Sequence, residues 1–420
     1  MHATETVIIG AGQAGLALSR HLTSAGRDHV VVDRGRLAER WRSERWDSLR
    51  LLTPNWMTRL PGWSYDGPDP DGFMTAAEVV AFFEAYAASF GAPVLEGVTV
   101  ESVEPAGGGF RVSTDAVTWR TANVVVATGA ADVPRVPGLA GHLPAHVHQI
   151  TPSRYRNPAG LPDGGVLVVG ASSSGLQIAD ELARAGRRAV LAVGDHNRMP
   201  RRYRGRDVMW WLDRTGVFDT RIEDVPHPER SRRSPSMQLV GRPDHGDLDL
   251  GTVHRQGVEL AGRLVDVDGG VVRFADDLAA TTARAEARLC RVLDGIDACI
   301  AGAGLDARVA PPDRPAPSTS PPRRGTCTCA VPASARSSGP PDTGRPTRGC
   351  ACPGSTTARA SPRPGAPSRA STGCSCWASA SRPAAAPTSS TASATTPAWS
   401  PTGSRAGPRR EPPPDQGRPR

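Results

Sequence analysis

Three glycines and one acid near the N-terminus have the spacing of a dinucleotide-binding site. Gly10, Gly12 and Gly15 form a G-x-G-x-x-G turn directly after the apolar run at residues 7–9, and Asp33 follows. In such a turn the first glycine permits a tight bend, the second lets the backbone approach a pyrophosphate, and the third allows a helix to pack closely on a strand; the acid can accept a hydrogen bond from a ribose hydroxyl. We therefore predict that a dinucleotide is bound by Gly10, Gly12, Gln13, Ala14, Gly15, Asp33 and Arg34.

The surrounding pattern predicts the elements that position these residues. Residues 7–9 are typical of a strand, LALSRHLTSAG (16–26) of a helix, and His29 to Val32 of a second strand that ends at Asp33. The N-terminus of the helix would offer unpaired N–H groups and a positive dipole to the phosphates. A third apolar strand, TANVVVATGA (121–130), ends in Ala127, Thr128 and Gly129, a small-residue turn that fits a strand end close to a cofactor. A plain buried strand end is the alternative interpretation.

A second glycine turn repeats the arrangement. GGVLVVGASSSGLQIADELARAG (164–186) predicts a strand, a turn and an amphipathic helix, and two such units indicate two nucleotides. No acid stands at the ribose position of this unit. The arginines that follow could hold a 2′-phosphate, which favours NADPH over NADH, although Asp195 weakens this case and a solvated basic loop is the alternative. The residues assigned to this nucleotide are Gly170, Ser172, Ser173, Ser174, Gly175, Arg198 and Arg201, with Arg202 beside them.

Composition divides the chain near residue 310. Residues 311–420 contain no Leu, Ile, Phe, Tyr or Met and carry a net charge of +11, whereas residues 1–310 have ordinary globular composition and a net charge of −3. The tail cannot bury enough apolar surface to offset the entropy of ordering it, so we predict that it is disordered. The negative charge of the first part gives no electrostatic case for nucleic acid. No apolar run reaches membrane-spanning length, so no membrane partner is predicted.

Cysteine usage divides in the same way. Residues 1–310 contain only Cys290 and Cys299, which is typical of a reducing, cytoplasmic setting. Both lie in ARAEARLCRVLDGIDACIAG (283–302), which we interpret as an amphipathic helix with the cysteines in the core. A redox pair near a cofactor is therefore not predicted. The tail contains three closely spaced pairs, Cys327/Cys329, Cys350/Cys352 and Cys374/Cys376, which resemble thiolate metal ligands but have another explanation given below.

Taken together, these segments resemble the two-dinucleotide flavoproteins, and within them the bacterial flavin-containing monooxygenase-like group. The order of glycine turn, Ala-Thr-Gly strand and second turn matches that group, as do YRNPAGLPDGGVLVVG (155–170) and RMPRRYRGRDVMWWLDRTGVFD (198–219). RWDSLRLLTPNWMTRLPG (45–62) is similar to its flavin-proximal segment. The resemblance covers about residues 1–310 and implies FAD at the first turn and NADPH at the second. It also implies flavin contacts by Trp41, Trp46, Leu51 and Thr53.

The resemblance implies a monooxygenase. In that group NADPH reduces FAD, and the reduced flavin reacts with O2 to give a C4a-(hydro)peroxide that oxidises a small organic substrate, so no catalytic side chain and no metal need be assigned. One departure leaves a rival open. In the linker PGLAGHLPAHVHQITPSRY (137–155), the group's signature histidine falls on Thr151 when Tyr155 is aligned, and no Phe precedes the glycine. A flavin-dependent NAD(P)H oxidoreductase that does not oxygenate is the alternative.

The tail is explained by a shifted reading frame. With GC-rich codons read from the third base, residues 325–346 can give HVHLRRAGIRTVVWATGYRP, residues 372–381 can give GLLVLGLRF, and residues 387–406 can give FIDGVGDDAGLVADRLA. These resemble, in order, the Ala-Thr-Gly strand, a buried strand and the C-terminal flavin segment that the family has after residue 310. The cysteine pairs then correspond to shifted Leu and Val codons. The alternative is a tail that is read in its true frame and is either disordered, metal-binding or, through its basic residues, nucleic-acid-binding.

The sequence therefore predicts an α/β protein with two Rossmann-like dinucleotide-binding domains, the second inserted into the first. We place the FAD domain at residues 1–155, the NAD(P)H domain with a helical end at residues 156–310, and the out-of-frame tail at residues 311–420. We expect a chain read in this frame to retain flavin weakly, because the last part of its FAD domain is replaced.

Overall fold

The computed structural model describes residues 1–268, 270–317, 328–330 and 374–378, the last two groups as backbone strands only. Most of the predicted disordered tail, including its three cysteine pairs, lies outside the residues whose side chains are described. The described tail residues begin with 311–317, which contact the long helix α8 (Leu278–Gly302). Arg314 pairs there with Asp294 and Asp297, each at 2.7 Å. The domain boundaries proposed from the sequence stay predictions.

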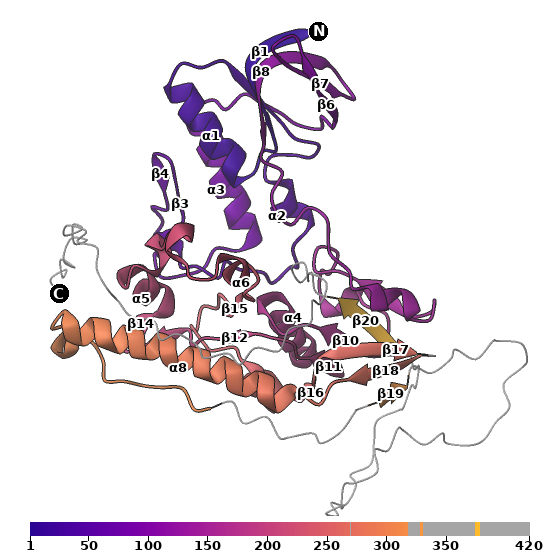
Figure 1. Ribbon diagram of the computed structural model, residues 1–420, viewed down its shortest axis with the longest axis vertical. Coiled ribbons are helices and arrows are strands. Elements are labelled where there is room, and N and C mark those ends of the chain that lie inside the picture. The colour runs from indigo at the N-terminus through magenta and orange to yellow at the C-terminus, as the bar shows by residue number, and fades with distance from the viewer. Residues whose placement is uncertain (269, 318–327, 331–373, 379–420) are drawn as a thin grey trace, which may run out of the picture. The chain divides into compact units, whose positions relative to one another are not determined.

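The first sheet has six strands in the order β5-β2-β1-β8-β7-β6. Their bounds are β1 (His2–Ile9), β2 (His29–Val32), β5 (Val94–Leu95), β6 (Val100–Ala106), β7 (Gly109–Thr114) and β8 (Thr118–Val126). Strands β5, β2, β1 and β8 are parallel, while β8, β7 and β6 form an antiparallel meander, which Figure 1 shows beside β1. Parallel neighbours bring their carboxyl ends to one edge, so the ends of β1, β2 and β8 meet.

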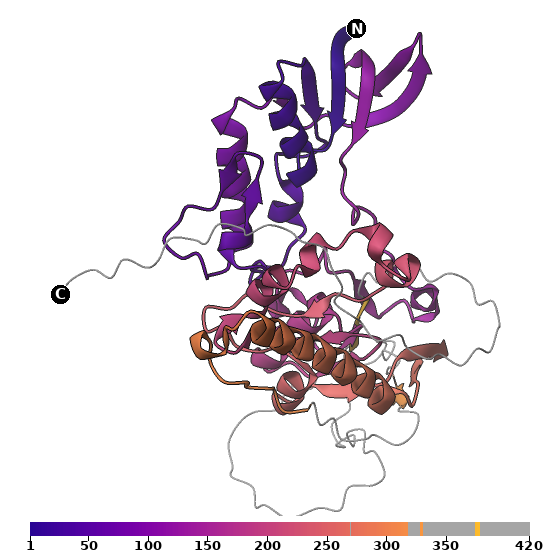
Figure 2. The same cartoon turned by 60° about the vertical axis from the view of Figure 1, so that its left-hand side comes forward.

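Two helices pack together on this sheet. Helix α1 (Gln13–Ser24) connects β1 to β2, and α3 (Ala76–Ser89) lies beside it in both views (Figures 1 and 2). Leu16 of α1 shares a buried cluster with Val79, Val80 and Phe83 of α3. Helix α3 begins at a capping box in which the Thr75 hydroxyl accepts from the Glu78 N–H and the Glu78 carboxylate accepts from the Thr75 N–H.

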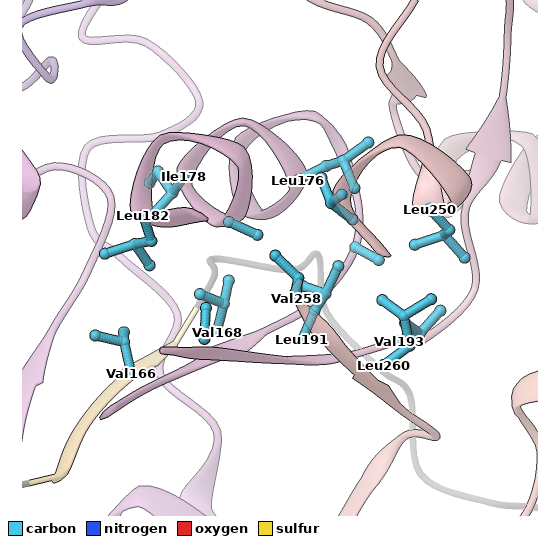
Figure 3. Close-up of a cluster of buried hydrophobic side chains, with 14 of the residues drawn as sticks. Val166, Val168, Leu176, Ile178, Leu182, Leu191, Val193, Leu250, Val258 and Leu260 are labelled. Atoms are coloured by element: carbon cyan, nitrogen blue, oxygen red, sulfur yellow. The ribbon is translucent and has the colours of Figure 1, made fainter. Parts of the chain in front are cut away.

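The second sheet is wholly parallel, with strand order β16-β11-β10-β20-β9. The strands are β9 (His148–Ile150), β10 (Gly165–Val169), β11 (Ala189–Ala192), β16 (Glu259–Ala261) and β20 (Cys374–Ala378), and α4 (Ser173–Arg184) connects β10 to β11. Figure 3 shows α4 packed on this sheet: Leu176, Ile178 and Leu182 belong to the same buried cluster as Val168 and Leu191 of the strands. Strand β20 falls within residues 372–381, for which the shifted frame also predicts a strand.

The remaining elements are short, apart from α8, which runs as one long orange helix in Figures 1 and 2. The helices are α2 (Glu39–Ser43), α5 (Val208–Arg214), α6 (Pro228–Arg232) and α7 (Leu250–Arg255). The 3-10 turns are η1 (Asn55–Met57), η2 (Gly138–His142), η3 (Pro158–Gly160), η4 (Val217–Asp219), η5 (Ile222–Asp224) and η6 (Asp306–Arg308). The strands are β3 (Arg59–Leu60), β4 (Trp63–Ser64), β12 (Asn197–Arg198), β13 (Arg202–Tyr203), β14 (Arg206–Asp207), β15 (Met237–Gln238), β17 (Leu264–Asp268), β18 (Val271–Phe274) and β19 (Thr328–Ala330).

The predicted α/β fold with two Rossmann-like units is confirmed, and so is the amphipathic helix near residue 290. The placement of Cys290 in the core is wrong, because its side chain is exposed, while Cys299 is half-buried. The buried stripe of α8 runs through Ala285, Leu289 and Leu293, and Cys290 lies one residue, about 100° of helix rotation, beyond Leu289. Over the described residues, no helix has the length and apolar composition needed to cross a membrane.

Candidate functional site

The first glycine turn lies between β1 and α1, and its three glycines serve different purposes. Gly10 has φ +113°, and a Cβ added there would lie 2.5 Å from the Ala127 carbonyl oxygen. A Cβ on Gly15 would lie 1.9 Å from the Gly10 carbonyl oxygen. Both positions therefore require glycine for the fold itself. A Cβ on Gly12, by contrast, would meet no described atom within 4 Å, so the space above Gly12 is open to a ligand.

The N-terminus of α1 faces the same space. Gly12 is the N-cap residue, and within the described part of the chain no side chain caps this end. The first helical N–H groups, which begin at Gln13 and Ala14, have no partner inside the helix because each would need a carbonyl one turn earlier. These donors and the positive end of the helix dipole suit an anionic group such as a pyrophosphate.

Asp33 ties the end of β2 to the glycine turn. One carboxylate oxygen accepts from the Ala11 N–H at 2.8 Å, and the other accepts from the Gly35 N–H, also at 2.8 Å. A carboxylate oxygen can accept more than one hydrogen bond, so the group can hold the turn and still accept from a ribose hydroxyl. These two hydrogen bonds therefore hold the Asp33 carboxylate next to the glycine turn.

A cavity of about 720 Å³ opens where β1, β2 and β8 end, a size within the usual range of ligand sites. It brings together most of the residues predicted for the first nucleotide. Those that line it are Gly10, Gly12, Gln13, Ala14, Asp33, Arg34, Trp41, Ala127, Thr128 and Gly129. Gly15 lies beneath the turn. The glycine turn, Asp33 and the Ala-Thr-Gly turn thus line one cavity, although they are far apart in the sequence.

Three residues from the flavin-proximal prediction do not line this cavity. Trp46 is only 6% exposed and packs in the hydrophobic cluster of α4. The Leu51 N–H donates to the Met74 carbonyl oxygen at 2.8 Å, and Thr53 is half-buried on the same segment. The structure thus gives Trp46 a role in the core, because it belongs to the same buried cluster as Leu176 and does not line the cavity.

Charged residues that the sequence did not single out also surround the cavity. They are Arg40, Arg45, Arg59, Glu39, Glu44 and Asp132. Arg34 pairs with Asp132 at 2.6 Å, and Arg40 pairs with Glu44 at 2.7 Å and donates to the Ala131 carbonyl oxygen. Burial, and next the nearby charge of Arg40, lower the pKa of Arg45, whose guanidinium lies 4.9 Å from the centre of the Trp41 ring. Periodicity and spacing in the sequence do not identify these residues, because contacts between distant segments of the chain bring them to the cavity.

The second glycine turn repeats the geometry of the first. Gly170 has φ +102°, and a Cβ on Gly175 would lie 1.9 Å from the Gly170 carbonyl oxygen, the same clash as at Gly15. Ser172, the N-cap residue of α4, stands where the first turn has Gly12. Ser173 is buried and donates to the Met237 carbonyl oxygen, while Ser174 is half-buried. Gln238 donates to the Ala171 carbonyl oxygen at 2.8 Å, so β15 holds this turn.

The arginines predicted to bind a 2′-phosphate already have partners within the protein. Arg198 is buried and pairs with Asp249 at 2.9 Å and Glu286 at 2.7 Å. Arg201 is 1% exposed, pairs with Asp207 at 2.5 Å and donates to the Leu52 carbonyl oxygen at 2.7 Å. A buried guanidinium with its own carboxylate is not accessible to a nucleotide. We therefore withdraw the assignment of Arg198 and Arg201 to the 2′-phosphate.

A half-buried acid, Glu181, joins the second unit to the segment before residue 50. Tyr155 donates to the Glu181 carboxylate at 2.8 Å. Burial raises the pKa of Glu181, against the hydrogen bonds from Tyr155 and Ser48, which lower it. Burial, then the hydrogen bond to Glu181, raises the pKa of Tyr155 as well.

Among the described residues, no group of three or more His, Cys, Asp and Glu side chains could hold a metal ion.

Comparison with known proteins agrees with this geometry. Residues 7–213 match the family model described as pyridine nucleotide-disulphide oxidoreductase. An uncharacterized CzcO-like oxidoreductase of Geobacillus kaustophilus is 34% identical over 279 residues, which are 66% of this chain and 77% of that protein. The indole-3-pyruvate monooxygenase YUCCA1 of rice is 34% identical over 191 residues, or 44% of this chain, and the match spans only about half (47%) of that relative's length.

The fold has a counterpart among solved structures. A mutant of the flavin monooxygenase from Stenotrophomonas maltophilia superimposes with a TM-score of 0.50 and 23% identity over 66% of this chain and 75% of that one, a likeness that concerns the fold alone. The sequence-based assignment to this group of oxidoreductases is confirmed by the family model and the Geobacillus relative. The chain belongs to the CzcO-like oxidoreductases and is therefore an enzyme.

Proposed function

We propose that the cavity at the first glycine turn binds FAD and that the second turn binds NADPH. The intact protein would then be a monooxygenase-type oxidoreductase that acts on a small organic molecule with O2. The observation that carries the proposal is the cavity itself, which joins the open space above Gly12, the carboxylate of Asp33 and the Ala-Thr-Gly turn. These groups match, in kind and position, the pyrophosphate and ribose of a dinucleotide.

The residues of this chain would bind and orient the cofactor. The N–H groups at the start of α1 would hold the pyrophosphate, Asp33 would accept from a ribose hydroxyl, and Trp41 and Gly129 would line the remaining cavity. FAD, when bound, supplies the transfer of electrons from NADPH to O2, which no side chain can perform. The protein's part is to position the ring system and exclude water.

The second nucleotide would lie at the turn of Gly170 and Gly175, whose shape repeats the first turn. A 2′-phosphate would need a cation other than Arg198 and Arg201. Arg202, at the start of β13, is exposed, and among the described residues its guanidinium makes one long hydrogen bond of 3.3 Å, to the Gly205 carbonyl oxygen. We propose Arg202 for this role, which the ratio of NADPH to NADH oxidation rates in Arg202→Ala would test.

A reductase that does not oxygenate is the second candidate, favoured by the degenerate linker. Thr151, where the group has a histidine, shares a 2.9 Å hydrogen bond with Ser153 and so belongs to a local turn. The test is to mix the purified chain with FAD, NADPH and ¹⁸O2 and a panel of small amines, sulfides and ketones. Labelled product supports the monooxygenase. NADPH oxidation that yields only hydrogen peroxide supports the second candidate, and NADPH oxidation by protein from which all flavin has been removed contradicts both.

A further inference from the structure

The peptide group between Ala171 and Ser172 lies in the second glycine turn, and one side chain fixes its orientation. The side-chain N–H of Gln238 donates to the Ala171 carbonyl oxygen at 2.8 Å, and Gln238 is 0% exposed. A carbonyl oxygen only accepts, so the amide nitrogen of Gln238 must face Ala171. In a trans peptide the C=O and N–H groups point in opposite directions, so this bond directs the Ser172 N–H away from Gln238.

The first glycine turn fixes the equivalent peptide with other groups. The Ala11 carbonyl oxygen accepts from the Ala38 N–H at 3.3 Å, and the Ala11 N–H donates to the Asp33 carboxylate. In the second unit Val193 follows β11 as Asp33 follows β2. Valine has no polar side chain, so the side chain that fixes the centre of the second turn comes instead from Gln238, on β15.

The segment that carries Gln238, residues 237–242, is itself held on two sides. Three polar side chains of α4, spaced four and three residues apart and so on one face of the helix, bind it. They are Ser173 (to the Met237 carbonyl oxygen), Gln177 (to the Leu239 carbonyl oxygen at 2.8 Å) and Asp180 (to Arg242). On the other side, a Cβ added to Gly241 would lie 2.1 Å from the Leu51 carbonyl oxygen. These contacts fix the backbone from which the Gln238 amide reaches the turn.

We propose that Gln238 is a positioning residue for the second nucleotide: by holding the Ala171 carbonyl, it keeps the Ser172 N–H directed at the pyrophosphate of NADPH. This inference rests on the proposed function, since it takes the second turn as the nucleotide site. Ser172 has the place of the turn's second glycine, where the backbone approaches a pyrophosphate. Without the Gln238 bond this peptide must be ordered when the ligand binds, and that ordering lowers the affinity.

The chain contains a matched control for this role. Gln177 is also buried and also donates through its side-chain N–H to a carbonyl oxygen at 2.8 Å, but it lies more than one helical turn beyond Ser172. Among the described residues the Gln238 Oε1 atom has no partner, so Gln238→Met removes a single hydrogen bond. Gln238→Met and Gln177→Met should therefore lower the urea midpoint by similar amounts.

The measurement is a calorimetric titration of the flavin-free 420-residue chain with NADP⁺. Gln238→Met should weaken NADP⁺ binding by about ten- to a hundredfold, which is the usual effect of losing a well-placed hydrogen bond to a charged group. Gln177→Met should bind NADP⁺ as the unaltered chain does, because it leaves the turn peptide fixed.

Gln238→Glu gives a readout that lost packing would not give. Its carboxyl group has the shape of the amide but can donate to Ala171 only when protonated. Burial favours the neutral form, whereas Arg198, opposite Gln238 in the β12–β15 pairing, favours the charged form but is already paired with Asp249 and Glu286. Relative to the unaltered chain, the NADP⁺ affinity of this variant should rise as the pH is lowered from about 8 to about 5, and that of Gln238→Met should stay constant.

The possible failures can be told apart. If the unaltered chain binds NADP⁺ and Gln238→Met binds it equally well, or Gln177→Met weakens binding as much, the inference is wrong and the proposed site stands. A relative affinity of Gln238→Glu that does not change with pH has the same meaning, and this comparison within one protein decides the question even where Gln238→Met does not fold. An unaltered chain that does not bind NADP⁺ overturns the proposed second site and the inference with it.

Discussion

Gly12 and Gly15 belong to the same turn but tolerate a side chain differently. A Cβ on Gly15 would overlap the Gly10 carbonyl oxygen at 1.9 Å, whereas a Cβ on Gly12 would point into open space. The second turn supports this distinction, because it has Ser172 at the position of Gly12 but keeps Gly175 at that of Gly15. A side chain at position 12 can therefore interfere with ligand binding without disturbing the fold, whereas a side chain at position 15 disturbs the fold itself.

We predict opposite outcomes for the two alanine variants. Gly12→Ala should lower stability by no more than about 1 kcal/mol, the usual cost of alanine at an N-cap, but weaken FAD binding at least tenfold. Gly15→Ala should lower stability by about 1–3 kcal/mol or more, because the backbone must move apart. Urea denaturation and FAD titration measure the two effects. FAD affinity unchanged in Gly12→Ala would place the ligand elsewhere.

For Arg201 the sequence and the structure lead to different expectations: the sequence suggests a phosphate ligand, and the structure shows a buried ion pair. Its ion pair with Asp207 is buried, and its bond to the Leu52 carbonyl oxygen holds the segment before Pro54. We predict that Arg201→Met costs about 3–5 kcal/mol, since Asp207 is left as an uncompensated buried charge. The NADPH-to-NADH preference should not change. Normal thermal stability together with lost NADPH preference would restore Arg201 as a phosphate ligand.

At the scale of elements, α4 is joined to Tyr155 and to the segment near Ser48 through one carboxyl group. Burial holds the pKa of Glu181 above its usual 4.5. The folded state then retains a proton that the unfolded chain releases, so Glu181 stabilises the fold fully below pH 4.5, and this contribution is lost as the pH rises through the folded-state pKa.

We therefore predict that Glu181→Gln reduces the loss of stability between pH 4.5 and 7, because glutamine can still accept from Tyr155 without becoming charged. Urea midpoints at both pH values measure the effect. Asp247, whose pKa burial also raises, keeps a slope of the same sign in the variant. Glu229→Gln, on the exposed helix α6, is the control and should leave the slope unchanged. An unaltered slope in Glu181→Gln would contradict the assignment.

Helix α8 shows what pattern alone can miss at this scale. Its amphipathic sequence correctly predicts a helix, but a shift of one residue decides whether a cysteine faces the core or solvent. The periodicity of the apolar residues predicts the position of the buried face of α8 only to within about one residue. The residues that pack against α8 determine whether the side chain next to Leu289 is buried or exposed.

At the scale of the whole molecule, local patterns predicted the two glycine turns and their strands and helices, since the required residues lie within about 25 positions of one another. They did not predict the partners of Arg198 and Arg201, because Asp249, Glu286 and Leu52 are distant in sequence. They also did not predict the core position of Trp46, which depends on a buried cluster formed largely by residues after 155. The charged groups around the cavity, such as Asp132, escaped notice for the same reason.

The shifted-frame hypothesis makes a prediction at this scale. A gene corrected by one base so that residues from about 318 onward are read in the alternative frame should yield a protein that keeps its flavin through desalting. The present chain should lose most of it, because the replaced segment is absent from the FAD domain. Visible absorption after gel filtration measures retained flavin. Equal retention by both proteins would contradict the hypothesis.

The central claim is that the cavity at the ends of β1, β2 and β8 binds FAD. The most direct test is a titration of the 420-residue chain with FAD, monitored by flavin fluorescence and visible absorption, with Gly12→Ala alongside. The account predicts saturable binding that shifts the flavin spectrum and is at least tenfold weaker in the variant. Absence of saturable binding, or equal binding by both proteins, would contradict it.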